Sequence, residues 1–582
     1  MIFKKQYETP HRQLKNIPNL WDVSAFVVIL SIFAALSWGA SQMLAPYNVG
    51  QPLALSLEPS ALPGYAIRTV LRMFVALFLS LMVTLIIAPL AAKNRQAEKL
   101  IIPLIDILQS IPILGMLALT VVAFIQLFPN RLLGPECAAI FAIFTSQVWN
   151  MILSLYQSIK TIPSDYQDAA AIFHFSAWQR FWRIEIPHAI PSLLWNMMLS
   201  LSAGWFFVVA SEAISVSNQT ILLPGIGSYI SVAIVESNIM AIFYAIITMF
   251  VVILIYDQLL FRPLIVWSER FKNTNFEDTL LSTSWFYDFL THTYLLKRCK
   301  WIIEKFYDIS LLLGKTANKT QLPFAMTYHW RQQWAQAFSY IWTALLVLGI
   351  ALSGLFLWNY ISTQVQLSEI QKVFYLGIFS GLKVAVLILL ASIIWIPVGV
   401  WIGLNARACQ IAQPLIQFLA SFPVNLIYPV VVILIFRFNL NIELWTMPLI
   451  ILGTQWYILF NVIAGASNIP KELRLVTQNF NVKGWLLWKR LILPAIFPFY
   501  VTGAITAAGG AWNATIVAEV LQWGDKKVVA TGLGSYIAEY TTSGDFPRIA
   551  LGIAVMCSYV ILINRLLWQK LYHLATTRFS LE

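Results

Sequence analysis

Four charged residues lie within otherwise apolar stretches of this chain. Arg72 and Lys383 are 311 residues apart, and Glu212 and Glu519 are 307 apart. A charge in the middle of a bilayer costs roughly 2.5–3.5 kcal/mol, so such residues usually face the protein interior and pair with one another. We therefore predict that Arg72 pairs with Glu212 and Lys383 with Glu519, in a structural or outer-gate role. Direct contact with a ligand and separate snorkelling to water are the alternatives.

No other set of residues has a spacing that suggests chemistry. None of the six histidines pairs with another at a metal-ligand spacing in an apolar run. The cysteines Cys137, Cys299, Cys409 and Cys557 are scattered along the chain. Gly314-Lys315-Thr316 is similar to the end of a phosphate-binding loop, but Ile309 stands where that loop needs its first glycine. We expect no catalytic residue, no metal and no cofactor.

The composition is that of a polytopic membrane protein. Of 582 residues, 59% are hydrophobic and 11% charged, whereas soluble domains carry roughly 25% charged residues. A membrane-spanning helix needs about 20 apolar residues. Twelve such runs occur, in two sets of six: 24–44, 67–92, 103–128, 135–157, 191–213 and 238–261, then 338–361, 376–403, 414–438, 443–465, 498–520 and 546–568.

The distribution of basic residues predicts the orientation in the membrane. The first run follows a basic start and is too long for the apolar core of a signal peptide, which indicates an uncleaved anchor with the N-terminus inside. Lys and Arg then gather in the loops predicted to be cytoplasmic, while the outer loop 45–66 has none. Both termini are expected to be cytoplasmic. Lys526 and Lys527 fall on the opposite side from this rule. The net charge of +12 thus reflects membrane orientation rather than binding of nucleic acid.

The second half of the chain repeats the first. The motif Gly-x-Gly-Ser-Tyr-Ile begins at Gly225 and again at Gly532, and Trp205 matches Trp512 at the same offset of 307. Six spans per half make the repeats parallel, related by an axis along the membrane normal. The predicted fold is all-α, with about 12 transmembrane helices in two pseudo-two-fold repeats of six. We expect a first unit at 1–264, a cytoplasmic linker at 265–335 and a second unit at 336–582.

Each half has a cytoplasmic loop between its fourth and fifth spans, at 162–190 and 469–497. In the first loop Pro163 suits the first turn of a helix. Asp168 follows, as an acid suited to capping or to the positive end of the helix dipole. Small Ala169 and Ala170 leave room for another surface to approach. We predict a helix-turn-helix shaped to fit a groove.

These loops resemble the Glu-Ala-Ala loop of ABC importer permeases. The pattern is Glu-Ala-Ala, three residues, Gly, nine residues, then Ile-x-Leu-Pro. The first copy has Asp168, Ala169, Ala170, His174, Ile184 and Pro187 at these places, and the second has Leu475, Asn481, Leu491 and Pro494. The segments around Glu212-Gly225 and Glu519-Gly532 are similar to the nitrate, sulfonate and taurine branch of that family.

The resemblance implies a membrane permease moving a small polar solute, such as nitrate, sulfonate, taurine or bicarbonate, across a bacterial inner membrane. It implies two copies of a separate ATPase, docked on the two loops, and a periplasmic or lipid-anchored solute-binding protein. Membrane lipid is the other expected partner, and nucleic acid is not. The second loop has lost the acid and both alanines, so we predict that the first loop is the more sensitive docking site.

Two further expectations follow from the family pattern. It has glycine where His174 and Asn481 stand, and both residue types tolerate positive φ better than most; we predict positive φ at both. The solute path should lie between the halves. It should be walled by the small residues Ala203-Gly204 and Gly509-Gly510-Ala511 of the fifth spans, with Trp205 and Trp512 beside it.

Two other classes of protein are less consistent with the sequence. A secondary transporter with two six-helix halves, of the major facilitator kind, would show an acidic-Arg-Gly pattern after its second span. The segment 91–99, Ala-Ala-Lys-Asn-Arg-Gln-Ala-Glu-Lys, does not fit that pattern. A membrane-embedded enzyme would need a reactive constellation, and no Gly-x-Ser-x-Gly elbow is present.

Overall fold

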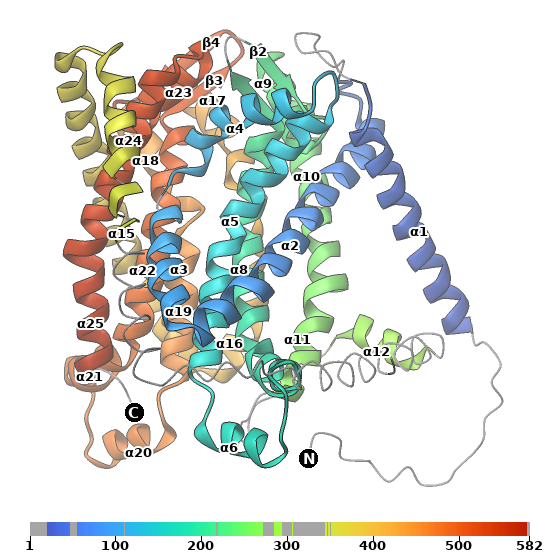
Figure 1. Cartoon of the computed structure of the whole chain (residues 1–582), viewed down its shortest axis with the longest axis vertical. Helices are drawn as coiled ribbons and strands as arrows, with labels where there is room; N and C mark the ends of the chain where they lie inside the picture. Colours follow the sequence, from blue (N-terminus) through green and yellow to red (C-terminus); the bar gives the residue numbers. More distant parts are fainter. Residues whose placement is uncertain are drawn as a thin grey trace, which may run out of the picture.

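The protein is a bundle of long helices with short elements at both ends (Figure 1). The computed structural model describes residues 20–46, 55–109, 111–216, 219–271, 284–293, 305, 344–345, 347–349 and 351–578. Eight helical stretches in this part are long and apolar enough to cross a membrane. Their main helices are α1 (Leu20–Met43), α2 (Leu62–Lys93), α5 (Leu133–Lys160), α8 (Ile186–Glu212), α10 (Ile239–Tyr256), α15 (Leu367–Leu404), α22 (Leu493–Ala518) and α24 (Phe546–Ile563).

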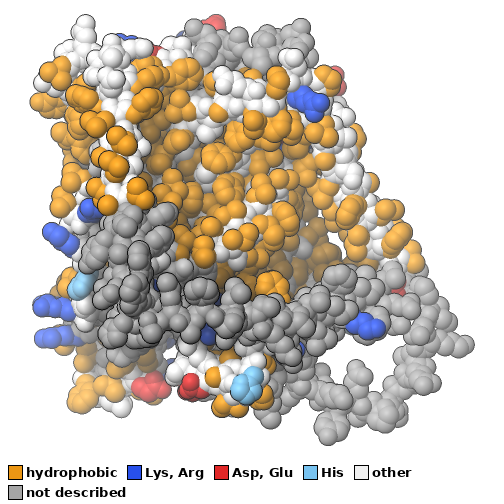
Figure 2. All heavy atoms as spheres, viewed as in Figure 1, with side chains coloured by type: hydrophobic (Ala, Val, Ile, Leu, Met, Phe, Trp, Pro, Cys, Tyr) orange, Lys and Arg blue, Asp and Glu red, His pale blue; other side chains and the backbone are white. Residues whose placement is uncertain are grey.

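Hydrophobic side chains cover the middle of the visible face, and charged side chains gather toward its two ends (Figure 2). The exposed side chains of α1 and α15 are mostly large and apolar, including Phe33 and Trp401. Soluble proteins rarely expose an apolar surface this wide to water. The protein is therefore a membrane protein with its helices across the bilayer.

Several predicted spans are not single straight helices. The run 103–128 divides into α3 (Arg95–Leu108), which is amphipathic, and the short α4 (Ile113–Leu127), with Pro112 capping the second piece. The run 414–438 divides into α16 (Ala406–Ser421) and α17 (Tyr428–Phe438), bent by 66°. The run 443–465 divides into α18 (Ile442–Leu452) and α19 (Gln455–Ser467), bent by 44°. Counting each of the last two pairs as one span gives ten candidate spans among the described residues, not twelve.

The repeat is visible in the packing as well as in the sequence. In the first half α2, α5 and α8 pack together, and in the second half α15, α19 and α22 do the same. Helices α3 and α16 begin alike: the side chains of Asn94 and Asn405 each accept hydrogen bonds from the second and third backbone N–H groups after them. Asparagine favours this capping position because it satisfies N–H groups that the helix leaves unpaired.

The two halves interlock through hydrogen bonds between them. The side-chain oxygen of Asn513 on α22 accepts from the backbone N–H of Ile113, at 2.7 Å. In a second hydrogen bond between the halves, the side-chain amide of Asn425 donates to the backbone carbonyl of Phe206, at 3.2 Å. Residues of α4 lie in the hydrophobic core of the second half, so the halves share one packed interface.

Two small β-hairpins, which were not predicted from the sequence, follow the fifth spans. Strands β1 (Ala213–Val216) and β2 (Gln219–Leu222) pair antiparallel, as do β3 (Val520–Trp523) and β4 (Lys526–Val529). Each hairpin leads into a short helix, α9 (Ile226–Val235) or α23 (Leu533–Ser543). Hairpins and short helices all lie at one end of the bundle (Figure 1). Lys526 and Lys527 lie on β4, at this same end.

The linker between the halves is described only in part. Helices α11 (Arg262–Ser268) and α12 (Trp285–His292) are seen, and Phe289 of α12 contacts Trp21 of α1 with ring centroids 5.7 Å apart. Most of 265–335, including Gly314-Lys315-Thr316 and Cys299, lies outside the described residues, as does the basic start of the chain. The predicted span 338–361 is described only from residue 344, with gaps.

Candidate functional site

The two predicted loops are helix-turn-helix units at the end of the bundle opposite the hairpins (Figure 1). The first contains α6 (Ser164–Ile172) and α7 (Ala177–Arg180), and the second contains α20 (Lys471–Asn479) and α21 (Gly484–Leu487). His174 and Asn481 have φ of 49° and 52°, which confirms the prediction of positive φ. Each is the left-handed residue of a Schellman turn: Phe175 N–H bonds to Ala170 O in one loop, and Val482 N–H to Thr477 O in the other.

Both loops have apolar side chains that the described residues leave exposed. Phe173 is 70% exposed and Phe480, at the matching position, is 78% exposed. Leu475 is also well exposed.

The acid and the alanines of the first loop do not share one face. Asp168 is exposed, and the structure gives it no hydrogen bond or ion pair with the described residues, so its role is not to cap α6. Ala170 is only 4% exposed, because the chain folds back over it in the Schellman turn. Ala170 itself therefore presents little surface to a partner, and the room that Ala169 and Ala170 leave for one stays a prediction.

The loops join the fifth spans through matching π-helical turns, at Phe181–Glu185 and Trp488–Ile492. Ile184 and Leu491 lie in these turns, and Pro187 and Pro494 are the second residues of α8 and α22. Each turn is continuous with the helices on both sides, so Ala177–Glu212 and Gly484–Ala518 are unbroken helical stretches.

The first loop is also held by an ion pair. Glu185 is buried, with Lys93 Nζ at 2.7 Å and Arg180 Nε at 2.9 Å from its carboxylate. The matching residue of the second loop is Ile492, which cannot pair. There Arg474 donates to the carbonyl of Ala466 at 2.9 Å instead. The two loops are thus attached to the bundle by different contacts.

The predicted pair between Arg72 and Glu212 is present and belongs to a larger cluster. Arg72 Nη1 lies 2.6 Å from Glu212 Oε1, and both side chains are fully buried. Arg72 also makes a bidentate contact with Glu136, at 2.6 and 2.7 Å. Glu212 accepts further bonds from Thr69 Oγ1 and the Gly227 N–H, both at 2.6 Å.

The second cluster repeats the first with looser geometry. Lys383 Nζ lies 3.6 Å from Glu519 Oε1, which confirms the second predicted pair, and 3.1 Å from Glu443 Oε2. Glu443 stands 307 residues after Glu136, so the repeat offset could have found the third member of both clusters. Lys383 is 12% exposed and Glu443 is 47% exposed, so this cluster is partly open to solvent.

The clusters tie the hairpin end of each half together. A Cβ on Gly225 would lie 2.3 Å from the Glu212 carboxyl carbon, and a Cβ on Gly532 would lie equally close to Glu519. Only glycine lets the start of α9 or α23 approach its glutamate so closely. This geometry supports the structural role predicted for the four residues.

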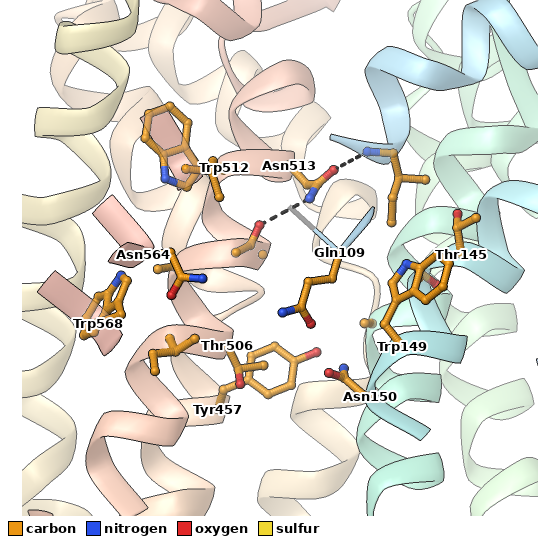
Figure 3. Close-up of a pocket in the computed structure, with 18 of the residues that line it drawn as sticks. Gln109, Thr145, Trp149, Asn150, Tyr457, Thr506, Trp512, Asn513, Asn564 and Trp568 are labelled. Carbon is orange, nitrogen blue, oxygen red and sulfur yellow. Dashed lines mark hydrogen bonds between the residues drawn. The ribbon is translucent and has the colours of Figure 1, made fainter. Parts of the chain in front are cut away.

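A cavity of about 180 Å³ lies between the halves (Figure 3). One water molecule needs roughly 10–15 Å³ on this scale, so the space can hold a small solute with several waters. Helices α5 and α8 line it from the first half, and α19, α22 and α24 line it from the second. Asn564 and Trp568 also line it from a π-helical turn, Asn564–Trp568, below α24.

The described residues that line the cavity include both polar and apolar side chains, and none of them is Asp, Glu, Lys or Arg. Its polar side chains come from both halves: Gln109, Thr145, Ser146, Asn150, Tyr457, Thr506, Asn513 and Asn564. Trp149, Trp512 and Trp568 add indole rings. Amide and indole N–H groups are hydrogen-bond donors, so the cavity can hold an uncharged polar group or an anion. A cation would find no carboxylate in this lining.

The predicted wall of small residues is partly right. Ala203, Gly509 and Gly510 line the cavity, and Trp512 does too, whereas Gly204, Ala511 and Trp205 do not. Trp205 is buried in the core of the first half against Tyr256, with ring centroids 5.6 Å apart. Gly509 has open space where a Cβ would lie. No sequence signal marked the amides as a group, since four separate segments supply them.

A family model described as "Binding-protein-dependent transport system inner membrane component" matches residues 80–262 and 395–568. One match lies in each half of the chain, and together they contain both loops and the residues that line the cavity.

Curated relatives match about half of the chain or less. The bicarbonate transport system permease protein CmpB of Synechococcus elongatus is 26% identical over 31% of this chain and 59% of its own length. The nitrate import permease protein NrtB of Leptolyngbya laminosa is 28% identical over 32% of this chain and 62% of its own length. A probable ABC transporter permease protein of Brucella abortus is 25% identical over 40% of this chain and 88% of its own length. The chain thus spans about six tenths of the length of the first two relatives.

Proposed function

Because this chain belongs to the family of binding-protein-dependent transport system inner membrane components, we propose that it supplies both halves of the membrane pathway of an ATP-driven importer. The observation that carries the proposal is the uncharged polar cavity, which lies between the two repeats and is walled by both of their fifth spans. A solute held there contacts both halves at once. Rotation of one half against the other would then open the cavity to one side of the membrane at a time.

The two loops are the proposed docking sites for two copies of a separate ATPase. Exposed Phe173 and Phe480 supply the apolar contact, and the π-helical turns connect the loops to α8 and α22 without a break in the helix. ATP-driven closure of the ATPase dimer would displace the loops, and α8 and α22 would follow. The proposed orientation places the two loops and both termini on the cytoplasmic side of a bacterial inner membrane. The hairpin end receives a periplasmic or lipid-anchored solute-binding protein.

The proposed solute is a small oxyanion. The cavity lining has amide, hydroxyl and indole donors and no carboxylate, and uncharged donors stabilise an anion without holding it too tightly for release. The names of the relatives, a bicarbonate permease and a nitrate permease, point to the same class. Bicarbonate and nitrate are therefore the first solutes to test, with taurine as a zwitterion for comparison.

The direct test uses the chain purified with its ATPase and solute-binding protein and reconstituted in vesicles. We expect uptake of bicarbonate or nitrate that depends on ATP and stimulates ATP hydrolysis. Uptake driven by an ion gradient without ATP would indicate a secondary transporter instead. Uptake of taurine but neither anion would overturn the proposed solute class and leave the importer standing.

Filling the cavity should block transport without disturbing assembly. Gly509→Leu points a new side chain into open space within the cavity, so we expect uptake to fall severalfold while the ATPase still co-purifies. Gly354→Leu is the matched control, because Gly354 also has open space around it but does not line the cavity. Equal uptake by both variants would argue against the cavity as the pathway.

Charge reversal should separate the two loops. Asp168→Lys changes an exposed acid at the place where the family pattern has Glu, whereas Leu475→Lys changes a residue that has already lost that acid. We expect Asp168→Lys to reduce the ATPase retained in a pull-down severalfold, and Leu475→Lys to reduce it less. Equal retention would mean that the two loops dock equivalently.

A further inference from the structure

The cavity has a repeat-related counterpart on the other side of the interface. This second cavity measures about 50 Å³. Ala203, Phe207, Tyr457 and Gly510 line both cavities and form the wall between them. If the repeat were exact, the two cavities would be alike.

At three matched positions the larger cavity has a polar side chain that the smaller one lacks. Gln109 matches Ala420, Ser146 matches Gly453, and Asn513 matches Phe206. At a fourth position, Asn150 and Tyr457, both side chains are polar. At one matched position the polar side chain lies in the smaller cavity: Ser202 lines the smaller cavity where Gly509 lines the larger. The Ser202 hydroxyl is already hydrogen-bonded to Ser421 and to the Met198 carbonyl. The divergence is therefore directional, with donors gathered in one cavity.

Two of the amides in the larger cavity have no partner within the part of the chain that the structure describes. Neither the side chain of Asn150 nor that of Asn564 makes a hydrogen bond there, although both border the cavity (Figure 3). A polar group held in a membrane protein interior is costly unless a ligand or water satisfies it. These two amides approach the space from opposite halves, one from α5 and the other from the π-helical turn below α24.

We infer that the transported anion binds in the larger cavity only, off the pseudo-two-fold axis, with Asn150 and Asn564 as its main ligands and Gln109 as a further donor. This inference rests on the proposed function, from which it takes the small oxyanion as the solute. The smaller cavity, lined by Phe206, Phe422 and Tyr428, then serves packing between the halves. Fusion of the two repeats in one chain makes such divergence possible, because each half occurs once and can specialise.

The test moves the glutamine from one cavity to the other. In the vesicle assay with bicarbonate or nitrate, Gln109→Ala and Asn150→Ala should each raise the KM for the anion about tenfold. The maximal rate and ATPase retention should change little. Ala420→Gln alone should leave the KM within about twofold of the parent. The double variant Gln109→Ala with Ala420→Gln should be no better than Gln109→Ala.

Each outcome of this test either supports or contradicts a single anion site in the larger cavity. Recovery in the double variant, or a raised KM in Ala420→Gln alone, would mean that both cavities bind the solute and would overturn the single site. An unchanged KM in both alanine variants would also overturn it, while the transport proposal stands if the parent protein carries the anion. If the parent carries no anion at all, the proposed solute class fails, and the anion site fails with it.

Discussion

Replacing Arg72 with methionine should cause a large loss of folded protein, and Lys383→Met should cause a smaller loss. Arg72 is the counter-charge of two carboxylates, Glu136 and Glu212, and all three side chains are fully buried. Removing one partner of a buried ion pair costs roughly 3–5 kcal/mol, because it leaves an uncompensated buried charge. A folded protein has only about 5–15 kcal/mol of stability to lose.

The second half offers a matched comparison at the same place in the repeat. Lys383 and Glu443 are partly exposed, whereas Glu519 is fully buried, so Lys383→Met leaves one carboxylate that water can reach and one that it cannot. Arg72→Met leaves two fully buried carboxylates without their counter-charge, so we expect the fall in stability to be smaller for Lys383→Met. Yield from membranes and thermal unfolding in detergent measure both variants directly.

A control distinguishes loss of charge balance from loss of packing. The triple variant Arg72→Met, Glu136→Gln, Glu212→Gln removes all three charges and keeps the volumes similar. Neutral replacement of a buried charged triad is often tolerated, so this variant should recover much of the yield that Arg72→Met loses. If the triple variant is as poor as the single one, the shape of Arg72 matters rather than its charge. A simple exchange of Arg72 and Glu212 should not rescue, because Glu136 would then face another carboxylate.

The repeat made part of this structure readable from sequence. Residues separated by the same offset occupy equivalent places in the two halves, so the pairs Arg72–Glu212 and Lys383–Glu519 could be predicted from the sequence alone. His174 and Asn481 could be assigned positive φ because two residue types that tolerate it replace glycine at one position of the family pattern. These predictions depended on local geometry or on charge, which act over short distances.

Other features depend on tertiary packing that no single segment reveals. The run 103–128 is apolar enough to span, yet Pro112 and the amphipathic start of α3 divide it. The hairpins after Glu212 and Glu519 follow from the need to pair backbone groups beyond the ends of α8 and α22, and their short strands lack a strong alternating pattern. The cavity combines side chains from residue 109 to residue 568, so its chemistry appears only when the halves meet.

An acidic residue in the cavity should exclude the proposed anion. Asn564→Asp changes one atom type and almost no volume, and the matching residue of the first half is already an aspartate, Asp257, so the fold should accept it. Two like charges about 5 Å apart repel by roughly 3 kcal/mol at an effective dielectric constant of about 20. Since about 1.4 kcal/mol is a factor of ten in affinity, the KM for bicarbonate or nitrate should rise by about two powers of ten.

Asn564→Leu separates this repulsion from the loss of a donor. Leucine has a similar size and removes the amide without adding charge, so its effect should stay near the cost of one hydrogen bond, about 0.5–1.5 kcal/mol. We therefore expect anion uptake to decrease from the parent to Asn564→Leu and much further to Asn564→Asp, with ATPase retention unchanged in all three. If Asn564→Asp transports as well as Asn564→Leu, the anion does not pass close to this residue. If it instead gains uptake of a cationic or zwitterionic solute, the cavity selects by charge, but the native solute is not an anion.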